Sequence, residues 1–387
     1  MLRFLTAGES HGPGLTVIIE GIPHGAPVRK AEIDAQLHRR QQGYGRGGRM
    51  KLETDAAEIT GGVRHGRAMG GPIALFIRNK DYENWRAVMD PDGEPPQPPQ
   101  KAITHPRPGH ADLAGALKFA TLDARDVLER ASARETTARV AAGAIARQLL
   151  ATAAGIELRS GVIALGMVRA ETPPAWDALG KCDDSPFRTP FKKLEPAMKA
   201  AVNGARIAGD TLGGVIHLEA RGLLPGLGSH VQWDRKLDGR IAQALMSIHA
   251  VKAVEIGEGV AAAALPGSAV HDEIGYDAKA RRFTRPTNRA GGIEGGISNG
   301  EPVICRIYLK PIPTLMRPLM SVDFATRQPV NAQKERSDTC VVPAAGVIAE
   351  AMLALVLAHA LLEKFGGDSL ASLRDAVTRE ASRLRAL

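Results

Sequence analysis

The amino-terminal segment AGESHGPG (7–14) holds the first side chains in this sequence that could do chemistry. Ser10 and His11 lie between glycines just before an apolar run, so a tight turn would hold the imidazole close to backbone amides. A histidine suits acid catalysis because its ordinary pKa lies near neutrality. An inert turn residue is the simpler interpretation.

The segment THPRPGHADL (104–113) offers a second group. Its two prolines stiffen the loop. Three of its side chains could bind an anion or move a proton, namely His105, Arg107 and His110. A rigid turn that leads into the next helix is the alternative, and it needs only the prolines.

Polar residues around a helix start form the third group. In LERASARETT (128–137), Arg130, Ser132 and Arg134 lie where backbone amides and the helix dipole favour an anion. Ser132 and Glu135 also have the spacing of a capping box, with the serine at the N-cap. Capping alone could therefore explain Ser132.

The stretch HRRQQGYGRGGRMK (38–51) contains the pattern G-x-G-x-x-G. A dinucleotide-binding fingerprint needs a buried strand before it, but Ile33 and Leu37 upstream have helical spacing. We interpret the stretch as an anion-binding loop, because glycines let amides approach a ligand and guanidinium groups contact carboxylate or phosphate at two points. Its arginines are Arg39, Arg40, Arg46 and Arg49. A solvated surface loop is the alternative.

Three later segments are also unusual. Paired glycines in NRAGGIEGGISNGEP (288–302) would let a flat or phosphorylated ligand approach the backbone, and they argue against a strand. Two prolines in LKPIPTLMRP (309–318) fix a strand exit beside Lys310. KERSDTC (334–340) places Arg336 and Asp338 just before an apolar helix. Taken singly, none of these segments defines a function.

Composition limits the class of protein. The chain has 387 residues, 44% hydrophobic and 24% charged, as in an ordinary soluble globular protein. Its net charge is +8, but aromatic residues are only 4% and the arginines lie in loops, so small anionic ligands explain the charge better than nucleic acid. Three scattered cysteines predict neither disulfides nor a metal site and fit a reducing cytoplasm. The first residues lack the apolar core of a secretory signal.

Strand-like and helical patterns alternate along the chain. Branched residues bounded by Gly or Pro predict strands over 15–23, 70–80, 213–222 and 302–311. Apolar spacing predicts helices over 111–130, 132–155, 234–254 and 344–365, the first with Leu113, Leu117 and Leu128 on one face. The last carries charged residues, which favours a core helix over a membrane span. The proline-rich stretch 90–101 predicts an exposed connection. No composition break or repeat appears, so we expect a single domain over 1–387.

Together these segments resemble one family, the chorismate synthases. The motifs occur in that family's order and spacing over almost the whole chain: GESHGPG, RRQQGYGRGGRMK, THPRPGHADL, ERASARETT, AGDTLGG, GLGSHVQWDRKLD, GGIEGGISNGEP, KPIPTL and ERSD. Thr339 after Asp338 and Ala131 beside Ser132 depart from the pattern. Neither departure supplies an expected catalytic group.

The resemblance implies a lyase that converts 5-enolpyruvylshikimate 3-phosphate to chorismate by a 1,4-elimination of phosphate, in the shikimate pathway to the aromatic amino acids. It implies a requirement for reduced FMN without net redox change, and NADPH as the reductant where one is used. It implies an α+β fold, a β-α-β sandwich with long helices packed between antiparallel sheets, and a cytoplasmic homotetramer.

The resemblance also implies roles for individual residues. His11 resembles the acid that protonates the leaving phosphate, His110 the group that protonates reduced flavin, and Asp338 the residue that helps flavin accept the substrate proton. Ser10 and Ser132 resemble hydroxyls that position these protons. Substrate binding is implied for Arg40, Arg46, Arg49, Arg107, Arg134 and Arg336, and contact with NADPH for Arg40 and Arg46. FMN binding is implied for Arg130, Ala131, Ser132, His249, Ala250, Gly295, Lys310, Pro311, Ile312, Pro313, Thr314 and Arg336.

Two other classes of function rank below the lyase. A nicotinamide-dependent oxidoreductase would rest on the glycine pattern, which lacks its strand and helix context. A nucleic-acid-binding protein would rest on net charge alone, and its mark would be binding to arbitrary duplexes that weakens steeply as salt rises.

Overall fold

Two antiparallel sheets frame the protein, which we describe from a computed structural model over residues 2–48, 54–94, 100–335 and 337–386. The smaller sheet has the strand order β1-β2-β6-β3, and the larger has the order β10-β15-β9-β7-β8. The strands of the first are β1 (Arg3–Ala7), β2 (Gly14–Glu20), β6 (Ile73–Arg78) and β3 (Glu58–Gly61). Those of the second are β10 (Val251–Ile256), β15 (Val303–Leu309), β9 (Gly214–Arg221), β7 (Glu157–Leu165) and β8 (Val168–Arg169).

Alternating apolar residues give each sheet a buried face. Ile73, Leu75 and Ile77 are buried along β6, and every second residue of β15 from Val303 to Leu309 is buried in the same way. A period of two places such side chains on one side of a strand. Each sheet therefore has an apolar face to cover.

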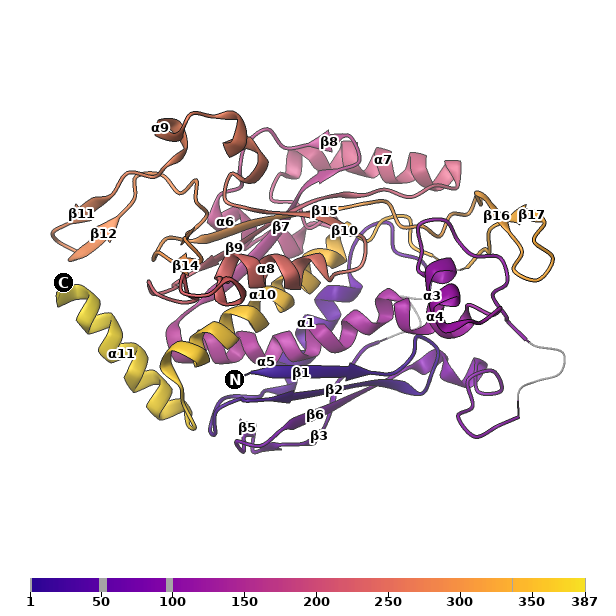
Figure 1. The fold of residues 1–387 in the computed structure, drawn as a ribbon, viewed down its shortest axis with the longest axis horizontal. Coiled ribbons are helices and arrows are strands. Elements are labelled where there is room, and N and C mark those ends of the chain that lie inside the picture. Colours follow the sequence, from indigo (N-terminus) through magenta and orange to yellow (C-terminus); the bar gives the residue numbers. More distant parts are fainter. Residues whose placement is uncertain (1, 49–53, 95–99, 336, 387) are drawn as a thin grey trace.

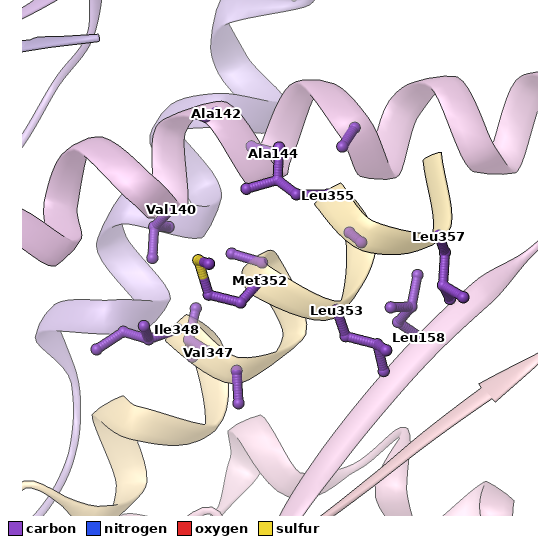
Figure 2. Close-up of a cluster of buried hydrophobic side chains, with 14 of the residues drawn as sticks. Val140, Ala142, Ala144, Leu158, Val347, Ile348, Met352, Leu353, Leu355 and Leu357 are labelled. Atoms are coloured by element: carbon purple, nitrogen blue, oxygen red, sulfur yellow. The ribbon is translucent and has the colours of Figure 1, made fainter. Parts of the chain in front are cut away.

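Long helices cover these faces. Figure 1 shows α5 (Thr136–Ala154) and α10 (Val342–Phe365) running between the sheets, with α1 (Lys30–Gln41) beside them. α5 packs on β2, whereas α10 packs on β7 and β9. Figure 2 shows apolar side chains of α10 gathered against Val140 and Ala144 of α5 and Leu158 of β7. Helices packed on antiparallel sheets confirm the predicted α+β class.

Small residues let α5 and α10 approach closely. A Cβ atom added at Gly143 would lie 2.4 Å from the Cβ of Ala351 and 2.5 Å from its Cα, which is far inside van der Waals contact. α10 has the length and hydropathy of a membrane span, but 89% of its most apolar window is buried inside the protein. It is the core helix that the sequence predicts.

Shorter elements complete the described chain. The helices are α3 (Asp112–Phe119), α4 (Arg125–Ala131), α6 (Trp176–Leu179), α7 (Glu195–Ala208), α8 (Leu237–Met246), α9 (Gly267–Val270) and α11 (Leu370–Ala386). The 3-10 turns are η1 (Lys80–Asn84), η2 (Ala133–Glu135), η3 (Cys182–Asp184), η4 (Lys192–Leu194), η5 (Trp233–Arg235) and η6 (Gly259–Ala264). Small hairpins pair β4 (Val63–Arg64) with β5 (Arg67–Ala68), β11 (Gly275–Asp277) with β12 (Arg282–Thr284), β13 (Ile293–Glu294) with β14 (Ile297–Ser298), and β16 (Met320–Val322) with β17 (Pro329–Asn331).

The four predicted strands are confirmed as β2, β6, β9 and β15 with shorter ends. The predicted helix over 132–155 forms as η2 and α5, and it ends at Gly155 with φ of 67°. The exposed connection over 90–101 is exposed at its described ends, and residues 95–99 lie outside the described ranges.

Two predicted helices are wrong in part. The helix over 111–130 is divided into α3 and α4, because Ala120 adopts a left-handed conformation with φ of 54°. Ala116 and Leu128 are buried there, whereas Leu113 and Leu117 are exposed. The helix over 234–254 stops at Met246, and Val251 begins strand β10 because its branched residues pair with β15.

Two short strands form beside the glycine pairs of 288–302, so the prediction against a strand is wrong there. Ile293 and Glu294 pair with Ser298 and Ile297 across a two-residue turn. Gly295 and Gly296 both have positive φ in that turn, of 60° and 89°. A tight hairpin of this kind requires positive φ at both central residues.

Candidate active site

His11 is held by a buried carboxylate. Its Nδ1 lies 2.8 Å from Oε1 of Glu129, and its backbone N–H donates to Oε2 of the same residue at 2.7 Å. Burial alone would raise the pKa of Glu129, but the contacts with His11 outweigh burial and lower it. Glu129 is therefore ionised, and it fixes the orientation of the imidazole.

The turn around His11 is fixed from several sides. The ring stacks on Trp85 with centroids 3.8 Å apart, and the backbone N–H of Ser10 donates to the carbonyl of Glu129. The amide of Asn79 donates to the carbonyls of Glu9 and Gly12. His11 thus lies in a loop as predicted, and it is buried there, with 7% of its surface exposed.

Arg134 connects this turn to a second group of charges. Its guanidinium donates to Asn79 at 2.8 Å and to Asp55 at 2.6 Å. Arg40 lies on the other side of the Asp55 carboxylate, with Nη1 3.8 Å from Oδ2. The two buried arginines thus share one buried counter-ion.

Arg40 closes the group from the end of α1. Its Nε donates to Thr136 at 3.0 Å and its Nη2 to the carbonyl of Ala133 at 2.7 Å, whereas Nη1 makes no hydrogen bond. Burial lowers the pKa of Arg40 to about 9. A guanidinium that has lost its water and has one donor atom without a hydrogen-bond partner is suited to an incoming anion.

The glycine loop brings Arg46 and Asp338 to the same place. Nε of Arg46 lies 3.3 Å from Oδ2 of Asp338, and the backbone N–H of Gly47 donates to Oδ1 at 2.5 Å. The charges of both side chains act on the pKa of Arg40. The helix α1 precedes this loop, which confirms the prediction that the glycine pattern follows a helix and not a buried strand. Arg49 and Arg336 lie outside the described residues.

His110 has its own carboxylate. Its Nδ1 lies 2.5 Å from Oδ1 of Asp112, and Arg107 donates to Oδ1 and Oδ2 of Asp112 and to Thr314. Burial alone would raise the pKa of Asp112, but His110 and Arg107 outweigh it and lower that pKa strongly. Asp112 therefore holds His110 and the segment 310–314 together.

His249 joins these groups from the end of α8. Burial lowers its pKa, and the charges of His110 and Arg40 add to this effect. Its Nδ1 is buried and has no hydrogen-bond partner. The next residue, Ala250, has a left-handed φ of 67° and accepts a hydrogen bond from the backbone N–H of Lys310.

Ser132 and Arg130 lie at the entry to η2. Ser132 Oγ accepts from the N–H of Arg134 at 3.3 Å, so it caps a 3-10 turn. The predicted capping box is only half formed, because Glu135 pairs with Arg139 at 2.6 Å. Arg130 donates to the carbonyls of Thr6 and Gly8, and Ala131 is half-buried beside it.

Other predicted ligands lie around this centre. Lys310 donates to the carbonyl of Gly109, and Ile312 accepts from Thr211. Gly109 also lies close to Pro313, and Pro311 continues the same exit from β15. His105 pairs with Asp323 at 3.2 Å, outside the cluster around His110. Gly295 is not brought into contact with the others: its turn lies at the start of α8, whereas His249 follows the helix end.

A cavity of about 640 Å³ opens beside His110. It lies between α3 and the β16–β17 hairpin, which are neighbours in Figure 1. Its lining is largely apolar and includes Leu113, Leu117 and Phe324, together with Arg107. A flat, largely apolar ligand with a charged end would suit such a surface.

Sequence reasoning missed the acidic partners. Glu129, Asp55 and Asp112 each hold a predicted histidine or arginine. Only Asp112 has a local signal, two residues after His110. Glu129 is 118 residues from His11, and Asp55 is 79 residues from Arg134, so nothing in the sequence links them.

An α+β protein with buried arginines and with histidines held by buried carboxylates defines a class: an enzyme that does acid chemistry on a small anionic substrate. The family model described as chorismate synthase matches residues 2–362. The chain belongs to the chorismate synthase family, and it is accordingly a lyase of the shikimate pathway.

Proteins of this family are similar to the chain over almost its whole length. A protein named chorismate synthase from Moorella thermoacetica is 57% identical over 370 residues, which is 96% of each chain. One from Aquifex aeolicus is 52% identical over 377 residues, which is 95% of this chain and 94% of that protein. A crystal structure of chorismate synthase superposes with a TM-score of 0.81 at 41% identity, covering 100% of this chain and 99% of the other.

Proposed function

We propose that the chain converts 5-enolpyruvylshikimate 3-phosphate to chorismate at the site around η2, with reduced FMN as its cofactor. The observation that carries this proposal is that Arg40 donates to Ala133 of η2, while Asn79 links Arg134 of η2 to the turn that holds His11. The substrate has a phosphate and two carboxylates, and buried guanidinium groups bind such anions strongly. Family membership supports the same reaction.

His11 is proposed as the acid that protonates the leaving phosphate. The carboxylate of Glu129 at Nδ1 fixes the orientation of the ring that must give the proton away. Stacking on Trp85 keeps the ring in one plane. Ser10 is proposed to position the same proton, since its backbone is bound to Glu129.

Arg40, Arg46 and Arg134 are proposed to bind the anionic groups of the substrate. The Nη1 atom of Arg40 lacks a hydrogen bond, which supports its contact with an anion. Arg107 remains a proposed substrate ligand, although Asp112 and Thr314 already accept hydrogen bonds from it. Arg49 and Arg336, outside the described residues, remain proposals on the resemblance alone.

Reduced FMN, when bound, would supply the electron density that promotes loss of the phosphate. The residues proposed to hold it are Arg130, Ala131, Ser132, His249, Ala250, Gly295, Lys310, Pro311, Ile312, Pro313, Thr314 and Arg336. The unpartnered, buried Nδ1 of His249 fits a polar group there, and the apolar cavity beside His110 fits a ring system.

Two side chains are proposed to take part in the other proton transfers, at the flavin and at the substrate ring. His110 would hold a proton against Asp112, whose lowered pKa keeps it ionised. Asp338 would assist removal of the ring proton, in an orientation fixed by Gly47 and Arg46. Ser132 would position these protons.

Further properties are proposed on the resemblance. NADPH would contact Arg40 and Arg46 where it serves as reductant. The two sheets and the helices between them would form a β-α-β sandwich within one domain over 1–387. The protein would be a cytoplasmic homotetramer, with no nucleic-acid or membrane partner.

An anaerobic assay tests the proposal. Phosphate and chorismate are followed together with chemically reduced FMN, with oxidised FMN, and with no flavin. Turnover is expected only with reduced FMN. Equal product formation in the absence of flavin would contradict the proposed cofactor, and no phosphate release from this substrate under any condition would contradict the reaction.

A further inference from the structure

A buried carboxylate outside the active site connects the elements that hold the glycine loop. Glu350 of α10 is 1% exposed. Its oxygens accept from Arg39 at 2.8 and 3.3 Å, from Arg147 at 2.7 Å, from Arg188 at 3.1 Å and from Ser160 at 2.6 Å. We refer to these five residues as the Glu350 cluster. None of them has a part in the proposed chemistry.

Arg39, the first arginine of the Glu350 cluster, fixes the end of α1. Arg39 lies in the last turn of that helix, immediately before Arg40. Successive helical residues point in directions about 100° apart, so Arg39 reaches Glu350 and Asp183 while Arg40 reaches Thr136 and Ala133. The contacts of Arg39 thereby fix how far Arg40 is rotated toward the site.

Arg188, the second arginine of the Glu350 cluster, lies next to the residues on which the glycine loop packs. Arg188 is buried with a left-handed φ of 50°, a conformation that a non-glycine residue keeps only when its surroundings hold it. Two residues earlier, the carbonyl of Pro186 accepts from the backbone N–H of Tyr44 at 2.7 Å. The ring of Tyr44 also packs on Phe187, with centroids 5.2 Å apart.

The helix that carries Glu350 also packs directly on this loop. A Cβ atom added at Gly43 would lie 2.9 Å from the Cβ of Pro343, in the first turn of α10. At Gly45 it would lie 3.0 Å from the Cβ of Cys340. The loop therefore has little room to move, provided that α1, α10 and the segment 186–188 keep their relative positions.

We propose that Glu350 is a positioning residue for anion binding. Through Arg39 and Arg188 it fixes two supports: the end of α1, which carries Arg40, and the segment 186–188, on which the loop with Arg46 packs. This inference rests on the proposed role of Arg40 and Arg46. Arg147 donates to the same carboxylate, but it lies on α5, about three turns beyond Thr136, and its other hydrogen bond goes to the carbonyl of Leu158 and not to either support. It therefore provides a matched control.

The experiment compares Arg39→Gln with Arg147→Gln in the full chain. Each variant removes one guanidinium from Glu350, so both are expected to lower the melting temperature. Binding of 5-enolpyruvylshikimate 3-phosphate is measured by calorimetry without reduced flavin, so that no turnover occurs. We expect Arg39→Gln to weaken substrate binding about 3- to 30-fold, the usual range for a residue that acts through others, and Arg147→Gln to leave it unchanged.

Further variants separate the possible failures. Arg39→Lys keeps the charge but loses the second hydrogen bond, so a smaller loss is expected, and it replaces Arg39→Gln should that variant not fold. Equal weakening by Arg39→Gln and Arg147→Gln, or no weakening by either, would overturn the positioning role. Arg40→Gln tests the premise: unchanged substrate affinity in that variant would overturn the proposed role of Arg40 instead.

Discussion

The partners of a histidine decide which proton chemistry it can perform. His11 contacts one ionised carboxylate and the face of Trp85, whereas His110 contacts a carboxylate that is shared with Arg107. Each carboxylate orients its imidazole, but only His11 lies on the turn that Asn79 ties to Arg134. Substitution of the two histidines is therefore expected to have different effects on turnover and on the bound flavin.

Alanine at each position tests this difference. His11→Ala should lower kcat about 10²- to 10⁴-fold, the usual contribution of general acid catalysis, with a much smaller effect on substrate binding. His110→Ala should change the absorbance of bound reduced flavin as well as slow turnover. Single-turnover rates and flavin spectra of both variants are the measurement. A spectral change in His11→Ala but not in His110→Ala would reverse the two roles.

For individual residues, the sequence predicts the side chains proposed to bind substrate or transfer protons, but it does not predict the carboxylates that position them. His11, His110, Arg40 and Arg134 are recognisable because they lie in motifs of unusual glycine, proline and arginine content. Their acidic partners lie in no unusual motif. The role of such a carboxylate can be recognised only after folding has brought it within hydrogen-bond distance of its histidine or arginine. Glu350 illustrates this limit, because it lies within a run of apolar residues.

At the scale of elements, η2 is the feature that orders the site. Its three residues separate α4 from α5, so the chain turns between Ser132 and Thr136. The carbonyl of Ala133 and the guanidinium of Arg134 are thereby directed at Arg40 and Asp55. The sequence predicts a helix start here, but the 3-10 turn depends on tertiary contacts that no local pattern contains.

Ser132 separates a capping role from a catalytic one. Ser132→Ala should cost about 0.5 to 2 kcal/mol of stability, because the cap of η2 is lost, whereas Ser132→Asp should keep the cap. If the hydroxyl also acts in catalysis, Ser132→Asp should melt like the parent protein and turn over more slowly. Full turnover by a stable Ser132→Asp variant would leave capping as its only role.

The helix pair α5 and α10 gives a second test at this scale. Gly143→Ala should be destabilising by about 1 to 3 kcal/mol, the usual cost of overpacking, because the new methyl group meets the backbone of Ala351. Gly204→Ala on the exposed face of α7 is the control, since no atom lies within 4 Å of its added Cβ. The control should gain about 0.5 to 1 kcal/mol from helix propensity. Thermal unfolding measures both, and equal effects would contradict the close packing.

At the scale of the whole molecule, buried ion pairs connect the layers. Glu350 links α10 to α1, α5 and β7, and Glu129 links α4 to the amino-terminal turn. Removing one partner of such a pair leaves a buried charge without compensation, which typically costs about 3 to 5 kcal/mol. The fold therefore depends on keeping these carboxylates ionised.

Acid should weaken the fold in a defined range of pH. The arginines around Glu350 outweigh the effect of burial and lower its pKa from an ordinary value of 4.5. A group with a lowered folded pKa stabilises the fold above its unfolded pKa and loses this contribution as pH falls toward the folded one. We expect a constant melting temperature from pH 7 to about 5 and a progressive fall as the pH drops below about 4.5. An unchanged melting temperature at pH 3 would contradict a stabilising role of the ionised Glu350 carboxylate.

The position of α10 near the carboxyl end has a consequence for synthesis on the ribosome. Its apolar surface is covered by α5 and by β7 and β9, all of which precede it in the chain and emerge first. A segment with the hydropathy of a membrane span therefore leaves the ribosome when its covering surfaces already exist. The same order leaves β7 and β9 without the cover of α10 until that moment, so a ribosome that stalls before residue 342 would expose the apolar face of the larger sheet to chaperones and proteases.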